Sequence, residues 1–111
     1  MKNRRLMLSA IAMALVAGLT LSRAVLAEGD AKAGQVKAIP CMGCHAIPGY
    51  SNVYPTYHVP RVGGQHADYI VMALKAYREG QRSHPTMRAQ ASTLSDQDMA
   101  DIAAYFSSKH E

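Results

Sequence analysis

The stretch PCMGCH, residues 40–45, decides which fold this chain adopts. It holds the only two cysteines of the 111 residues, Cys41 and Cys44, and His45 follows them directly. A cysteine pair at this spacing occurs in redox dithiols and in zinc sites, and with a following histidine it occurs where haem is covalently attached. A plain disulfide is a fourth possibility. The rest of the sequence has to distinguish among the four.

The first 27 residues have the pattern of an export signal. Basic residues at the start precede an uncharged apolar run over residues 6–22, and small residues stand before a cleavage point after Ala27. We therefore expect residues 1–27 to be a cleaved signal peptide and residues 28–111 to form one domain in the periplasm. The alternative is a retained membrane anchor, although the run is at the lower limit for spanning a bilayer.

The charge of the expected mature domain argues against nucleic-acid binding. The whole chain has a net charge of +4, but residues 1–27 hold four of its 12 Lys and Arg and none of its eight Asp and Glu. The remainder has eight of each and a formal charge of zero, whereas a nucleic-acid-binding domain needs a basic face. A domain of 84 residues also needs a staple beyond its own core, such as a covalent cofactor.

Three stretches are predicted to be helical, at about residues 30–38, 64–80 and 94–110, and no stretch has a convincing strand pattern. Ser95 and Asp98 resemble a capping box at the start of the third helix. The second and third helices carry amphipathic stripes, at Ile70, Val71, Leu74 and Tyr77 and at Met99, Ile102, Ala103 and Phe106.

Residues 46–63 are predicted to be a long loop with three prolines and three tyrosines. A loop of this length without secondary structure is uncommon in a compact domain and is usually functional. We expect its tyrosines to lie against something flat and apolar. A second loop, residues 81–93, joins the second and third helices.

The surroundings of Cys41 and Cys44 favour haem attachment. Zinc needs about four ligands, and the chain has neither a second cysteine pair nor a suitably spaced histidine pair. A redox dithiol belongs beside a βαβ pattern, which is missing. A plain disulfide leaves His45 unexplained. The pattern C-x-x-C-H is the attachment signal for haem c, with two thioether bonds and a histidine ligand to iron, and it follows an export signal here.

A six-coordinate iron needs a second axial ligand from the opposite face. The methionines after residue 27 are Met42, Met72, Met87 and Met99. Met42 lies within the attachment stretch, and Met72 and Met99 fall in predicted helices, where core packing is the simpler interpretation. Met87 lies in a predicted loop after Pro85 and is the best candidate, although methionine also fills gaps in cores.

Other side chains remain open as alternatives. His84 is the main rival for the second axial position, followed by His58 and His66, although lone histidines are mostly surface or satisfied core residues. Three arginines could pair with haem propionates or line a docking face, or could be solvated charges, namely Arg61, Arg82 and Arg88.

Taken together, the chain resembles the small monohaem class I c-type cytochromes of the bacterial periplasm. The resemblance covers essentially all of residues 28–111 and rests on GDAKAGQVKAIPCMGCH, HVPRVGGQHADYI, ALKAYREGQRSHPTM and LSDQDMADIAAYF. It implies an all-α class I cytochrome c fold, with about three main helices and long loops wrapped around one covalently attached haem c.

The resemblance also implies roles for particular residues. Cys41 and Cys44 would form the thioethers, and His45 and Met87 would be the axial ligands. The Pro60 carbonyl would accept a hydrogen bond from the other ring nitrogen of His45 and so orient the imidazole. The first and last helices would cross, with Gly34 allowing a close backbone approach near Tyr105.

The function that we expect is electron transfer, with iron cycling between Fe(III) and Fe(II) and redox proteins as donor and acceptor. With both axial positions filled, neither catalysis nor a small-molecule substrate is expected, and the cleaved chain would be soluble without stable membrane insertion. Two alternatives stay open: a dedicated haem subunit of a larger periplasmic dehydrogenase or reductase, and a gas-binding haem sensor or enzyme.

Overall fold

The computed structural model describes residues 28–109, so the predicted signal peptide at residues 1–27 lies outside the described residues. The described chain forms five helices and one antiparallel pair of strands. The helices are α2 (Ala31–Lys37), α3 (Ile39–His45), α4 (Ala67–Arg78), α5 (Pro85–Ala91) and α6 (Asp96–Ser107), and the strands are β1 (Ser51–Val53) and β2 (Thr56–His58). Within residues 28–109, no helix combines the length and apolarity that crossing a membrane requires.

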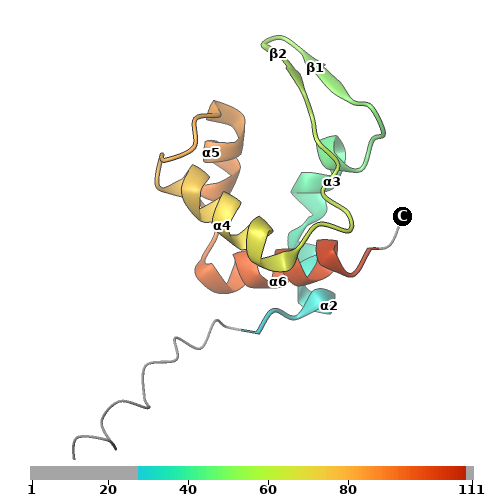
Figure 1. Cartoon of the computed structure of the whole chain (residues 1–111), viewed down its shortest axis with the longest axis vertical. Coiled ribbons are helices and arrows are strands. Elements are labelled where there is room, and N and C mark those ends of the chain that lie inside the picture. Colours follow the sequence, from blue (N-terminus) through green and yellow to red (C-terminus); the bar gives the residue numbers. More distant parts are fainter. Residues whose placement is uncertain (1–27, 110–111) are drawn as a thin grey trace, which may run out of the picture.

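Helices α2 and α6 cross closely at one end of the molecule (Figure 1). A Cβ atom on Gly34 would collide with the carbonyl oxygen of Asp101 and lie 2.9 Å from the Cβ of Tyr105. A Cβ on Gly29 would likewise collide with the carbonyl oxygen of Ala100. Two glycines therefore set the distance between the helices, and the expected close approach of Gly34 near Tyr105 is confirmed.

A buried carboxylate joins the two crossing helices. Asp101 is only 3% exposed and accepts hydrogen bonds from Lys37 Nζ at 2.5 Å, from the Asp30 backbone at 2.8 Å and from Gln97 Nε2 at 2.8 Å. Lys37 also pairs with Asp98 at 2.8 Å. The Lys37 ammonium and the Asp30 N–H hold the pKa of Asp101 below its usual range. Since a buried charge is stable only when paired and hydrogen-bonded, this cluster fixes how α2 sits on α6.

The predicted start and buried stripe of α6 are confirmed. The Ser95 side chain accepts from the Asp98 N–H, and the Asp98 carboxylate accepts from the Ser95 N–H at 2.9 Å, which completes the capping box. On α4, Ile70 and Leu74 are buried as predicted. The core cluster contains Ala38, Ile70, Leu74, Ala91, Met99, Ile102, Ala103, Tyr105 and Phe106.

The prediction that residues 46–63 lack strands is wrong. Ser51 pairs with His58 and Val53 with Thr56, which makes a short antiparallel hairpin. Strands of three residues are too short to show the alternating pattern from which strands are predicted. Tyr54, at the turn of the hairpin, is 94% exposed, so it does not pack against the protein core.

Two short helices also escaped prediction. α3 contains the CMGCH stretch, and α5 contains Met87, which was expected in a loop. Each helix has seven residues and a proline in its first turn, and two turns are too few for a clear helical period. In Figure 1, α3 and α5 lie on opposite sides of the view, with α4 and α6 below them and the hairpin above.

Candidate haem-binding site

Helix α3 places both cysteines on one side of the chain. Cys41 and Cys44 are three residues apart in a helix, so their side chains lie on the same face. Both are free thiols and half-buried. Burial, with a smaller contribution from Cys44, raises the pKa of the Cys41 thiol. Redox dithiols depend on a lowered cysteine pKa, so this environment does not favour that interpretation.

His45, the last residue of α3, is held in a defined orientation. Its Nδ1 lies 2.7 Å from the carbonyl oxygen of Pro60. Because a carbonyl can only accept, Nδ1 carries the proton and donates it. Nε2 of the neutral ring then keeps its lone pair, which is the form that binds a metal. The expected contact between His45 and Pro60 is present in the structure. Val59, directly before Pro60, is buried, and its N–H donates to the Tyr50 carbonyl at 2.9 Å.

Met87 lies in the first turn of α5. Its side chain is half-buried and packs against the core. Its backbone N–H donates to Nδ1 of His84 at 3.3 Å, so the His84 side chain caps the helix that carries Met87. The His84 ring also lies edge-on to Tyr57, with centroids 4.6 Å apart, and to Tyr77, at 6.3 Å. His84, the rival ligand, therefore has a structural role in this turn.

The other methionines and histidines have different surroundings. Met99 is fully buried in the core, as predicted, whereas Met72 is 68% exposed, which contradicts the prediction that it packs in the core. Nδ1 of His58 lies 3.1 Å from the Ser51 hydroxyl within the hairpin. His66 is exposed at the N-cap of α4.

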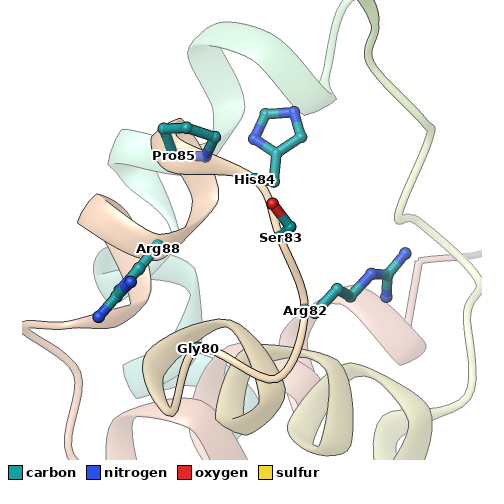
Figure 2. Close-up of a pocket in the computed structure, with 6 residues that line it drawn as sticks. All are labelled: Gly80, Arg82, Ser83, His84, Pro85 and Arg88. Carbon is teal, nitrogen blue, oxygen red and sulfur yellow. The ribbon is translucent and has the colours of Figure 1, made fainter.

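Two of the arginines singled out in the sequence lie near the start of α5, Arg82 in the loop before it and Arg88 within the helix. Figure 2 shows the pocket at this loop, where the side chains of Arg82 and Arg88 point away from each other. Arg82 lies over the ring of Tyr77 at 4.8 Å and donates to the Tyr69 hydroxyl at 3.3 Å. The two guanidinium groups thus do not converge on one anion.

The donor atoms fit a haem c. Two thiols and a neutral imidazole nitrogen come from α3, and a thioether comes from α5, across the view of Figure 1. These are the groups that attach haem c and fill its two axial positions in c-type cytochromes. Throughout residues 28–109, no three His, Cys, Asp or Glu side chains gather into a group that could hold a bare metal ion.

One set of contacts near Met87 was not predicted. The Tyr57 hydroxyl donates to Oγ1 of Thr86 at 3.2 Å across 29 residues of sequence. The only signal in the sequence was the cluster of tyrosines in residues 46–63, which indicated a functional loop without naming a partner.

Comparisons with known proteins identify the family. The family model described as Cytochrome c matches residues 31–109. Cytochrome c-554(548) of Halomonas halodenitrificans is 45% identical over 84 residues, which cover 73% of this chain and 98% of that protein. Cytochrome c4 of Pseudomonas aeruginosa is 39% identical over 97 residues, which cover 87% of this chain and 47% of that protein.

A solved structure extends the likeness to the fold. Reduced recombinant cytochrome c4 from Pseudomonas stutzeri superposes with a TM-score of 0.57 at 30% identity, covering 76% of this chain and 53% of the other. The chain thus spans about half the length of the cytochrome c4 proteins that it matches. The all-α class I cytochrome c fold implied by the resemblance is confirmed, and haem c is the cofactor that this family uses. The chain belongs to the cytochrome c family.

Proposed function

We propose that this chain is a periplasmic electron carrier with one covalently attached haem c. The observation that carries the proposal is the position of His45 at the end of the CMGCH helix, with Nδ1 2.7 Å from the Pro60 carbonyl. A histidine held in this way presents a neutral nitrogen in a fixed direction, as metal-binding histidines do. We also propose that residues 1–27 are a cleaved leader and that residues 28–111 are the working domain.

Cys41 and Cys44 would hold the haem through thioether bonds. Their place on one face of α3, beside His45, lets one short helix supply both attachment points and the first axial ligand. Met87 would supply the second axial ligand from α5. Among the other methionines, Met99 is sealed in the core and Met72 is 68% exposed, and Met42 lies on the same helix as His45.

When bound, the haem supplies one-electron chemistry through its Fe(III) and Fe(II) states, and a methionine ligand favours the reduced form relative to a histidine ligand. With His45 and Met87 as its ligands, the haem iron would have no site left for a substrate. We therefore propose that the chain has no enzymatic activity and no small-molecule substrate. Its partners would be redox proteins that donate and accept electrons, and the absence of net charge after residue 27 argues against nucleic acid.

The first test is chemical. The chain, expressed with a haem-attachment system, should keep its haem in acidified organic solvent, because thioethers are covalent. The Cys41→Ala/Cys44→Ala double variant should release any haem that it binds. Extraction of haem from the native chain would contradict the proposed roles of both cysteines.

A second test separates a carrier from a gas-binding haem protein. If both axial positions are filled, the reduced native protein should bind carbon monoxide slowly or not at all, and Met87→Ala should bind it readily. Rapid binding by the native protein would favour the sensor or enzyme. Co-purification of the native chain with a dehydrogenase or reductase would instead favour the role of a dedicated subunit.

A further inference from the structure

Tyr57 connects the hairpin to the start of α5. Its hydroxyl donates to Oγ1 of Thr86 at 3.2 Å. Its ring lies edge-on to the ring of His84, with centroids 4.6 Å apart and planes at 77°. One half-buried side chain on β2 thereby contacts two residues on either side of Pro85, at the beginning of the helix that carries Met87.

The two residues that Tyr57 contacts determine the local backbone of Met87. Nδ1 of His84 accepts from the Met87 N–H, and the His84 carbonyl accepts from the Arg88 N–H at 2.9 Å. Thr86 directly precedes Met87. A helix of seven residues is marginal on its own, so the position of this turn depends on contacts from outside it.

The same strand also leads to the support of His45. Tyr57 lies three residues before Pro60, whose carbonyl holds Nδ1 of His45, and the buried Val59 lies between them. The segment over residues 57–60 therefore contains Pro60, which holds His45, and Tyr57, which contacts the residues beside Met87. A displacement of this segment would alter the two ligand positions together.

We propose that Tyr57 is a positioning residue that holds Met87 on the iron, acting through Thr86 and His84. The inference rests on the proposed function, because it takes Met87 as the second axial ligand. Without the Tyr57 hydroxyl, the α5 turn has one restraint fewer, so the state in which Met87 has left the iron becomes more populated. An added ligand that competes with Met87 then binds more tightly.

The test uses the oxidised holoprotein and imidazole as the competing ligand. Imidazole binding is followed by the loss of the near-infrared sulfur-to-ferric-iron absorption band. Tyr57→Phe and Thr86→Val each remove one side of the hydrogen bond, and each should raise the apparent affinity for imidazole about two- to fivefold, the change that a single exposed hydrogen bond supports. Because both variants remove the same bond, the double variant should show about the same increase as either single variant.

Two variants serve as matched controls. Tyr54→Phe removes a hydroxyl from the same hairpin at a position that is 94% exposed, and it should leave imidazole affinity unchanged. Thr86→Ser keeps the hydroxyl, so its affinity for imidazole should stay close to that of the native protein. The free energy of unfolding, measured on the same samples, shows whether a change in affinity merely follows a loss of stability.

The outcomes separate this inference from the function on which it rests. If the native protein has the sulfur band but Tyr57→Phe binds imidazole no more tightly than Tyr54→Phe, the positioning role is wrong and the proposed function stands. An equal increase in Tyr54→Phe would also overturn it. If the native protein keeps its haem but has no sulfur band, Met87 is not the ligand and both the inference and that ligand assignment fall.

Discussion

The crossing of α2 with α6 and the hairpin with α5 are held in different ways. At the crossing, glycines bring two backbones into contact and the buried Asp101 has three hydrogen-bond donors. The hairpin and α5 are short, and Tyr57 of the hairpin makes an exposed hydrogen bond to Thr86 of α5. The crossing therefore behaves as a scaffold, while the hairpin and α5 form an adjustable support for the proposed ligands.

This difference predicts two separable classes of variant. Substitutions at the crossing should lower the free energy of unfolding. Substitutions around Tyr57 should change ligand exchange at the proposed iron with little effect on stability, because elements with few buried contacts open at low cost.

Gly34→Ala is expected to have the largest effect on stability. The new methyl group would collide with the carbonyl oxygen of Asp101, which is backbone and cannot move aside by itself. Separating α2 from α6 should cost about 3 kcal/mol, measured by denaturant unfolding of the holoprotein. Gly43→Ala is the matched control: a Cβ there meets nothing within 4 Å, so this variant should be neutral or stabilised by up to about 1 kcal/mol. Equal losses of unfolding free energy in both variants would show that the close approach of Gly34 to α6 does not determine stability.

Asp101→Ala should have the next largest effect. It leaves the Asp30 N–H without its acceptor and leaves Lys37 with Asp98 as its remaining partner. An unsatisfied buried group typically costs about 2 kcal/mol. Thermal unfolding would measure the loss, and Glu79→Ala, at an exposed site outside the crossing, provides the control. If the unfolding temperature of Asp101→Ala equalled that of Glu79→Ala within error, Asp101 would not contribute to the stability of the crossing.

The same cluster predicts how stability depends on pH. Hydrogen bonds from Lys37, and then from Ser95, lower the pKa of Asp98 below 3.8. Hydrogen bonds from Lys37, and then from the Asp30 N–H, lower the pKa of Asp101 below 3.8. The contribution of these two carboxylates to the free energy of unfolding is present above their pKa in the unfolded chain. It disappears as the pH falls through their lower pKa in the folded protein. Asp101 and Asp98 raise the pKa of Lys37 above 10.5, so its contribution is complete below 10.5 and disappears as pH rises through the folded pKa.

The midpoint of thermal unfolding should therefore be nearly constant from about pH 5 to pH 9 and fall on both sides. In Lys37→Met the alkaline fall should disappear and the acid fall should become smaller, since Asp98 and Asp101 keep their other donors. An unchanged acid limb in Lys37→Met would show that other groups control acid unfolding.

Tyr54→Ser at the hairpin turn should have the smallest effect. The side chain is 94% exposed, and surface substitutions of this kind change stability by less than about 0.5 kcal/mol. Denaturant unfolding of the holoprotein checks this. A loss of unfolding free energy well above that value would mean that the hairpin turn is packed. The hairpin would then resemble the crossing of α2 with α6 in its contribution to stability.

The long helices were predictable because their sequences carry enough turns to reveal a period and a cap. The stripe of α6 and its Ser95–Asp98 capping box are visible in the sequence and present in the structure. The hairpin, α3 and α5 were missed because each element is too short to show a period. Their conformations depend on partners distant in sequence, such as Thr86 for Tyr57 and Pro60 for His45.

The candidate site was predictable in its chemistry more than in its supports. The spacing of Cys41, Cys44 and His45 is a local motif, so the sequence contains it directly. The capping of α5 by His84 was not predictable from the sequence. A histidine near a proposed ligand is equally consistent with a rival ligand, and only the structure shows its hydrogen bond to the Met87 N–H.

The near-infrared sulfur-to-ferric-iron band tests the proposed site most directly. It should be present in the oxidised native protein and in Met72→Ala, whose methionine is 68% exposed on α4, and it should be absent from Met87→Ala. A native protein without this band, or a band that persists in Met87→Ala, would contradict the assignment of His45 and Met87 as the axial pair.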